Sequence, residues 1–120
     1  MEYDKFQIGN TSVGTTNVPL GYNNSGTVVV PPNYKLKISR LNIINAGTAT
    51  ATVTISAVKG TEVIKLMEIA AAAQGSLNAL ESTVLLKEDQ NVYIDEGYYP
   101  AASISTGTGS VLGVGEFILE

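Results

Sequence analysis

The stretch from Val28 to Ile55, VVVPPNYKLKISRLNIINAGTATATVTI, contains an apolar alternation that changes phase in its middle. Leu36 and Ile38 occupy even positions, whereas Leu41 and Ile43 occupy odd positions and so have the opposite parity. Successive side chains of a strand point to opposite faces, so a regular strand cannot bury all four residues on one side. A chain with this pattern needs either a local irregularity or a second apolar surface.

Two structures explain the phase change. One extra residue near Ser39 and Arg40 would form a β-bulge that returns the apolar side chains to the buried face. Alternatively, the strand passes from one sheet to the other at the corner of a sandwich. In both cases Arg40 lies at the break, where its charge reaches solvent, and we expect these residues to be buried: Leu36, Ile38, Ile43, Val53, Ile55, Val92 and Ile94.

Other short apolar segments recur about every ten residues and are separated by turn-forming sequences. The chain is rich in Val, Ile and Thr, which favour strands, and in Gly and Asn, which favour tight turns. Its 120 residues correspond to one domain. The sequence therefore predicts an all-β protein, a jelly-roll-like antiparallel β-sandwich of about seven to nine short strands.

The two parts of the chain differ in apolar content. In residues 1–26 apolar residues are sparse, and we predict a short strand over Lys5–Ile8 followed by an extended N-terminal arm or loop. Residues 27–120 form the sandwich of this single domain, beginning with a strand at Thr27–Val30. Pro31 and Pro32 end that strand because neither has an N–H group to donate.

Three later segments carry more specific predictions. Ile64–Ala73 is rich in Ala and has helix propensity, but Val63 and Ile64 are β-branched and Gly75 cuts the run short, so a strand followed by a small-residue connection is favoured over a helix. The segment STVLLKEDQNVYIDEG reads as strand, tight turn and strand, and the chain closes with two strands around the turn TGTG. Gly113 and Gly115 in the last strand mark a bulge or the close approach of another backbone.

The composition argues against an enzyme. The chain contains neither His nor Cys, which removes the usual general base and the thiolate nucleophile. The carboxylates Glu88, Asp89, Asp95 and Glu96 are close in sequence but match no calcium loop, and we interpret them as a solvated turn and strand end. We therefore predict no catalytic residue, no metal site and no cofactor.

Charge and hydropathy limit the partners. The formal net charge is −4 and the seven basic residues form no stripe, which disfavours nucleic acid and anionic membranes as partners. No stretch reaches the roughly 18 apolar residues of a membrane span. The first residues, MEYDKFQIGN, contain no apolar run typical of a signal peptide.

The tyrosines are the best candidates for a binding role. Tyr22 and Tyr34 lie in predicted turns, and Tyr98 and Tyr99 lie in a predicted loop. Tyrosine is enriched at interfaces because it brings a large contact area with a polar tip. We therefore propose these four as interface residues, with ordinary packing within the loops as the alternative.

The middle of the chain combines a strand ending in a proline turn, a strand of the form KLKISRLNIIN, a small-residue turn and an alternating strand. This pattern resembles one found in small β-sandwich structural proteins of tailed bacteriophages and related viruses. LLKEDQNVYIDEG resembles the strand–turn–strand that follows in those proteins, although Pro32-Asn33 and Glu88-Asp89 replace their glycine turns. The matching positions in the first part are Val30, Pro31, Lys35, Ile38, Leu41, Ile43, Asn45, Ala51, Val53 and Ile55.

The resemblance covers about two-thirds of the chain and implies a non-enzymatic virion component. Such a protein would be a homo-oligomer that contacts capsid or tail proteins, assembled in the host cytoplasm and located in the virion. A capsid decoration (cement) protein is the first expectation, and a neck or tail accessory protein is the alternative. A different class is a carbohydrate-binding or adhesin-like module that would use Tyr98, Tyr99 and the Asp95–Glu96 loop.

Overall fold

The computed structural model describes residues 4–21, 27–47, 49–71, 82–85 and 92–119. These residues form strands and their connections, and none of them belongs to a helix that is long and apolar enough to cross a membrane. The strands are β1 (Asp4–Val13), β2 (Val18–Pro19), β3 (Tyr34–Asn45), β4 (Ala51–Lys59), β5 (Glu62–Ala71), β6 (Ser82–Leu85), β7 (Val92–Ile94), β8 (Tyr99–Ile104) and β9 (Gly109–Leu119).

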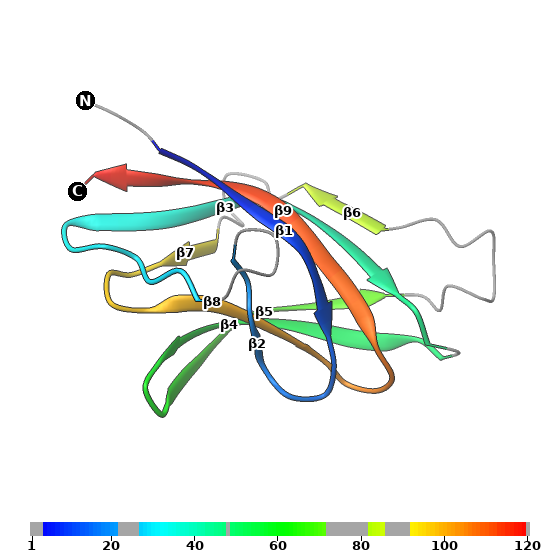
Figure 1. Ribbon diagram of the computed structural model, residues 1–120. Helices are drawn as coiled ribbons and strands as arrows, with labels where there is room; N and C mark the ends of the chain where they lie inside the picture. Colours follow the sequence, from blue (N-terminus) through cyan, green and yellow to red (C-terminus); the bar gives the residue numbers. More distant parts are fainter. Residues whose placement is uncertain (1–3, 22–26, 48, 72–81, 86–91, 120) are drawn as a thin grey trace.

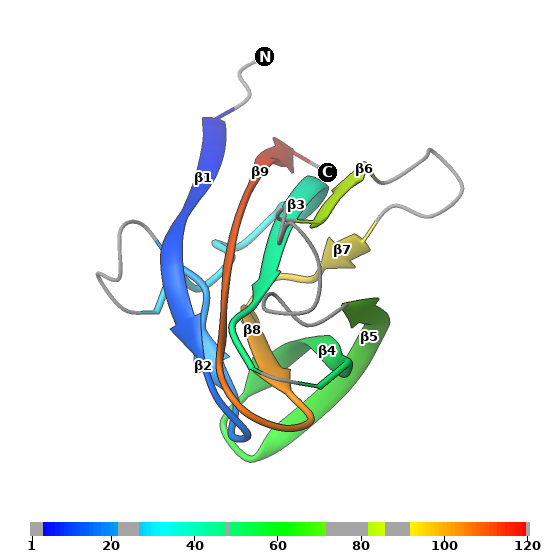
Figure 2. The same ribbon diagram turned by 90° about the vertical axis from the view of Figure 1, so that its right-hand side faces the viewer.

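The strands form two antiparallel sheets that pack face to face (Figures 1 and 2). The first sheet has the order β1-β9-β3, and both β6 and β7 pair with the outer side of β3. The second sheet has the order β2-β8-β4-β5. This arrangement confirms the predicted all-β, jelly-roll-like sandwich.

The phase change in β3 is a β-bulge. Ile38 pairs with Gly115 and Arg40 with Val114, so Ser39 is the extra residue. The Ser39 hydroxyl donates a hydrogen bond to the Val114 carbonyl oxygen at 3.2 Å, and the Arg40 side chain is exposed as predicted. All partners of β3 belong to the first sheet, which rules out the alternative of a strand that changes sheets.

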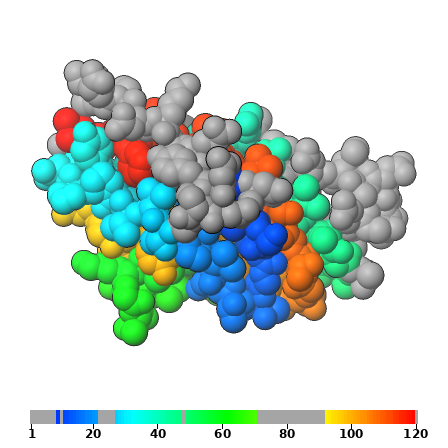
Figure 3. Space-filling view, in the orientation of Figure 1, coloured from blue at the N-terminus to red at the C-terminus, as the bar shows by residue number. Residues whose placement is uncertain are grey.

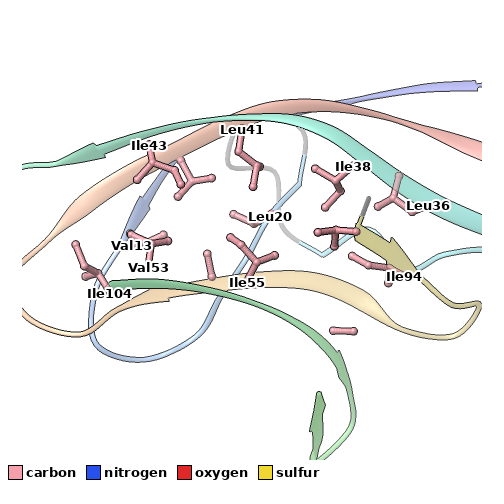
Figure 4. Close-up of a cluster of buried hydrophobic side chains, with 14 of the residues drawn as sticks. Val13, Leu20, Leu36, Ile38, Leu41, Ile43, Val53, Ile55, Ile94 and Ile104 are labelled. Atoms are coloured by element: carbon pink, nitrogen blue, oxygen red, sulfur yellow. The ribbon is translucent and has the colours of Figure 1, made fainter. Parts of the chain in front are cut away.

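The bulge places apolar side chains from both halves of β3 in one core between the sheets (Figure 4). Leu41 is fully buried together with Ile38, although the two residues have opposite parity. The predicted core is confirmed, since each of its members is at most 5% exposed: Leu36, Ile38, Ile43, Val53, Ile55, Val92 and Ile94.

The glycines of β9 allow β3 to approach closely. A Cβ atom at Gly113 would collide with the carbonyl oxygen of Arg40, and one at Gly115 with that of Lys37. The Leu41 side chain already lies 3.0 Å from the Cβ position of Gly113. Both predicted explanations for these glycines hold: another backbone approaches closely, and the β3 bulge lies opposite Val114, between Gly113 and Gly115.

The N-terminal prediction needs correction. β1 continues five residues beyond the predicted end at Ile8 and pairs with β9 along its length, apart from a bulge between Ile8 and Thr11. β2 pairs with β8, and Leu20 after it is fully buried in the core. The described part of residues 1–26 is thus a constituent of both sheets, because β9 and β8 would otherwise be edge strands with unpaired backbone groups.

Two expected connections also differ, and a third is confirmed. Thr27–Val30 is extended without strand pairing, although the Val30 N–H donates to the Tyr98 carbonyl oxygen at 2.9 Å. β6 and β7 are not a hairpin, because both run antiparallel to β3 at successive positions along its edge. The two closing strands around the turn TGTG are confirmed as β8 and β9; the turn leads from the second sheet to the first, so these two strands do not pair with each other.

The ambiguous alanine-rich segment is a strand as favoured, because Glu62–Ala71 forms β5 and pairs with β4. Residues 72 and 73 lie outside the described residues. β5 contains its own bulge: Lys65 pairs with Ser56 and Met67 with Ile55, which leaves Leu66 as the extra residue. In the space-filling view the β4–β5 hairpin projects at one end of the molecule, beside residues of the 27–45 region (Figure 3).

Candidate interaction surface

The described surface offers little for chemistry. Within residues 4–21, 27–47, 49–71, 82–85 and 92–119, no group of three or more carboxylates is placed to hold a metal ion. A hollow of about 190 Å³ lies over the β3 bulge and is lined by Ser39, Val114, Gly115 and Glu116. Its serine hydroxyl is bonded to the Val114 carbonyl oxygen.

The large hydrophobic side chains exposed on the described surface gather at one end of the sandwich. Tyr93 is 44% exposed on β7, and Leu119 is 45% exposed at the end of β9, where it pairs with Tyr34 at the start of β3. Val63 pairs with Val58 at the β4–β5 turn, and Val58 in turn pairs with Tyr99 at the start of β8. We call this region the tyrosine end; its exposed apolar residues are Val29, Val63, Ile64, Tyr93 and Leu119.

Tyr34 anchors this end from below the surface. Its N–H donates to the Pro31 carbonyl oxygen at 3.2 Å, which closes the proline turn before β3. Its ring is half-buried against the core and meets the Phe117 ring edge-on, with centroids 6.5 Å apart and an interplanar angle of 87°. The ring of Tyr34, a predicted interface residue, is therefore used mainly for packing within the molecule.

Tyr98 is also held by its own molecule. Its ring packs against the core, and the Lys59 ammonium lies over it at 5.6 Å from the centroid. Hydrogen bonding to the neighbouring Glu62 carboxylate, followed by desolvation and by the negative charges of Glu62 and Asp95, raises the pKa of Tyr98 above its ordinary value of 10.0.

Tyr99 and Tyr22 complete the predicted set. Tyr99 is half-buried and opens β8 opposite Val58, on the side of the second sheet that faces away from the core. Tyr98 packs toward the core instead, so the two adjacent rings do not form one platform. Tyr22 lies outside the described residues. The structure thus brings Tyr34, Tyr98 and Tyr99 to the same end but gives them different surroundings.

The acidic loop is a tight turn with defined hydrogen bonds. Gly97 has a φ of 86°, and its N–H donates to the Val30 carbonyl oxygen at 2.9 Å. The Asn33 N–H donates to the Glu96 carboxylate at 2.8 Å, and the Tyr98 N–H donates to the Asp95 carbonyl oxygen at 3.2 Å. These bonds join the β7–β8 turn to the proline turn, as expected for a turn rather than a metal site. Glu88 and Asp89 lie outside the described residues.

The exposed apolar residues were not selected by the sequence analysis, although a signal for one of them exists. Tyr93 stands between Val92 and Ile94, and the alternation VYI predicts that its side chain points away from the core. The Lys35 ammonium lies 5.8 Å from the centroid of its ring. Val29 carries no such signal, because the predicted strand at Thr27–Val30 does not form.

The opposite end of the sandwich, which we call the threonine end, is formed by the turns at residues 14–17, 46–50 and 105–108. These turns contain no charged residue. Asn45 bridges one turn, accepting from the Gly47 N–H at 2.9 Å and donating to the Ala49 carbonyl oxygen at 2.8 Å. The Ser105 N–H donates to Thr52, and the Thr52 N–H donates back to the Ser105 hydroxyl, both at 2.9 Å. These polar groups of the threonine end are thus hydrogen-bonded to one another.

Comparison with known proteins supports the architecture. No protein-family model matches the sequence, and no curated protein matches it significantly. The structure is similar to that of Eiger TNF from S. frugiperda, with a TM-score of 0.61 and 10% sequence identity over 100% of this chain and 94% of that one. A weaker similarity, with a TM-score of 0.41, is to the virus-like particle of the giant freshwater prawn Macrobrachium rosenbergii extra small virus (XSV). It has 10% identity over 99% of this chain and 79% of that chain. At these identities the likeness to Eiger TNF shows a shared fold.

Proposed function

We propose that the protein is a non-enzymatic structural component of a virus particle that attaches through its tyrosine end. Capsid decoration is the role we favour, with the chain stabilising the particle by contacts between subunits. Attachment at the neck or tail of the particle is the alternative. The sequence resemblance to small virion proteins motivates this assignment.

One observation carries the proposal: the exposed large hydrophobic side chains of the described surface lie at one end only. Isolated apolar residues are normal on a protein surface, whereas a gathered set marks a contact site. Charged residues adjoin the patch, as in the polar rim typical of interfaces: the Lys35 ammonium lies 5.8 Å from the centroid of the Tyr93 ring, and Glu62 directly precedes Val63 on β5. A particle-bound protein needs one adhesive end and one inert end, and the described surface has this polarity.

The carbohydrate-binding alternative is less well supported by the geometry. Sugar recognition commonly uses an aromatic ring whose face is open to stack on the ligand, together with free polar groups beside it. Lys59 lies over the Tyr98 ring, and the Glu96 carboxylate accepts a hydrogen bond from the Asn33 backbone. Two of the groups that would build a glycan site, the Tyr98 ring and the Glu96 carboxylate, are therefore engaged within the molecule.

The proposal is tested by co-sedimentation of the purified chain with particles made by the genome that encodes it. The double variant Val29→Ser/Leu119→Ser removes two exposed apolar contacts from the tyrosine end. We expect it to bind particles at least about ten-fold more weakly, because truncation of central apolar interface residues commonly costs more than 1 kcal/mol each.

The matched control is Thr50→Ala, an exposed residue at the threonine end, which should bind as the unmodified chain does. Failure of the unmodified chain to bind particles, together with binding to a glycan array, would replace this proposal with the carbohydrate-binding alternative. Equal loss of binding in both variants would show that the tyrosine end is not the attachment site.

A further inference from the structure

Strand β5 has one edge that pairs with no other strand among the described residues. It is the last strand of the second sheet, and its only ladder among the described residues is with β4. Its ten residues leave a row of backbone N–H and C=O groups on the outer side, where a further strand can pair. Val63 and Ile64 on this strand are 52% and 41% exposed. In many proteins charged side chains on an edge strand prevent pairing with another chain. The placement of the charges on β5 therefore decides whether this edge can pair with a further strand.

The bulge at Leu66 determines that placement. Residues three apart in a regular strand point to opposite faces, yet Lys65 and Glu68 lie on one face, with the Lys65 Nζ 3.1 Å from a Glu68 carboxylate oxygen. Their ladder partners explain this, because Ser56 and Thr54 of β4 share a face. The extra residue Leu66 shifts the parity between Lys65 and Glu68.

The same shift makes β5 complementary to itself. The midpoint of Glu62–Ala71 lies between Leu66 and Met67, which is also the midpoint between Lys65 and Glu68. A second β5 placed antiparallel about a two-fold axis at this point overlaps all ten residues of each strand. Lys65 then faces Glu68 of the partner subunit on the outer side of the sheet.

The remaining pairs also match in side and chemistry. Val63 faces Ala70 of the partner subunit, since the ladder with β4 places both on the outer side. Ile64 faces Ile69 of the partner subunit on the side of the core, because their β4 partners Ala57 and Val53 point inward. Without the bulge, this centred pairing would join residues from opposite faces.

We propose that two copies of this chain associate edge to edge through β5, forming one continuous eight-stranded sheet across a two-fold axis. A closed two-fold dimer uses the same surface on both subunits, as a self-complementary strand requires. Opposite charges facing each other across an antiparallel pair add stability, and each dimer contains two such contacts. This inference goes beyond the particle role. The two surfaces share Val63 and Ile64, but the β5 contact omits Val29 and Leu119, so each proposal can be tested by variants that leave the other's distinguishing residues intact.

The register is tested by disulfide trapping, which is clean in a chain without cysteine. Val63→Cys and Ala70→Cys are prepared separately and then mixed under oxidising conditions. Facing residues of an antiparallel pair have Cα atoms about 4.5–5.5 Å apart, within the range that a disulfide bridges. We expect a covalent dimer in the mixture. Either variant alone should give little, because the introduced cysteine of one subunit lies seven positions along the strand from the same cysteine of the partner subunit.

The electrostatic complementarity is tested by charge reversal with light scattering. Lys65→Glu places like charges opposite each other twice per dimer, as does Glu68→Lys, so each alone should raise the dimer dissociation constant about ten-fold. Mixing the two variants pairs glutamates with lysines between subunits and should restore a heterodimer. The contact within each chain stays repulsive in the mixture, so restoration reports the contact between subunits.

A strictly monomeric unmodified chain at high micromolar concentration would overturn the inference. A dimer that forms without the mixed disulfide would overturn it as well. The Val29→Ser/Leu119→Ser variant should still dimerise, and the Lys65→Glu variant should still bind particles. The two proposals can therefore fail separately.

Discussion

The two ends of the sandwich use their residues in opposite ways. At the threonine end, the polar groups of Asn45, Thr52 and Ser105 form hydrogen bonds of 2.8–2.9 Å within and between the turns. At the tyrosine end, charged and aromatic residues hold the turns together, while Val29, Val63 and Leu119 remain exposed. The polar groups at one end are therefore hydrogen-bonded within the molecule, whereas the other end retains exposed apolar surface for a partner.

The difference follows from where the strands end. β3 and β9 begin and finish together at both ends, with Asn45 opposite Gly109 and Tyr34 opposite Leu119. The threonine end closes with short turns of small residues, which leave little side-chain surface. The tyrosine end adds the projecting β4–β5 hairpin and the 28–33 segment, which carry larger side chains beyond the core.

The largest expected effect concerns close packing at the threonine end. Gly109→Ala places a Cβ atom against the Ile44 carbonyl oxygen and 3.3 Å from the Ile104 Cδ1 atom. Because backbone occupies that space, β9 and β3 would have to separate locally. We expect a loss of about 3 kcal/mol in the free energy of unfolding, measured by urea denaturation.

Gly14→Ala is the matched control for that substitution. Gly14 lies in a turn at the same end, and nothing is within 4 Å of its Cβ position. Its stability should be unchanged or slightly higher, because alanine reduces the entropy of the unfolded chain. Equal losses in both variants would mean that the threonine end is not tightly packed around Gly109.

The next effect concerns the side chain that closes this end. Asn45 is 3% exposed, and Asn45→Ala removes both the acceptor for the Gly47 N–H and the donor to the Ala49 carbonyl oxygen. We expect a loss of about 2 kcal/mol, because a buried polar group is left without its partner. Thr50→Ala in the same turn should change stability by less than about 0.5 kcal/mol. A small loss at Asn45 would show that water replaces its bonds.

The sequence predicts most of the threonine end and of the core. Alternating parity identifies β3, β4 and β9, and the broken parity between Ile38 and Leu41 locates the bulge at Ser39. Local patterns suffice here because each strand has one buried face. The collinear strands β6 and β7 escape prediction, since their shared partner β3 lies about 40 residues or more away in sequence and no local pattern encodes that pairing.

The tyrosine end is harder to predict for a physical reason. Tyrosine side chains have apolar rings and polar tips, so the residue type alone does not separate packing from contact. Tyr34 and Tyr98 reach the core, whereas Tyr93 is exposed by strand alternation. The exposure of Val29 depends on the unpaired 27–30 segment, whose hydrogen bond to Tyr98 joins residues 68 positions apart.

The exposed apolar residues of the tyrosine end should matter little for folding. Val29→Ser/Leu119→Ser removes side chains that are 51% and 45% exposed, so it should change the free energy of unfolding by no more than about 0.5 kcal/mol. Urea denaturation of this variant beside Gly109→Ala contrasts the two ends directly. A loss above about 2 kcal/mol would show that these residues stabilise the fold rather than await a partner.

The smallest expected effect is the pH dependence of the Tyr98–Glu62 contact. Because the pKa of Tyr98 is raised in the folded chain, the folded state keeps this proton at a pH where the unfolded chain releases it. The contact's contribution is therefore complete below about pH 10 and is lost as the pH rises through the folded pKa.

Tyr98→Phe should reduce the fall in stability above pH 10, relative to the unmodified chain. Absorbance titration of tyrosinate should also lack its latest-titrating component in this variant. Identical alkaline profiles would mean that the hydroxyl is solvated rather than bonded to Glu62. In that case the turns of the tyrosine end would be held by backbone bonds and by the Lys59–Tyr98 contact.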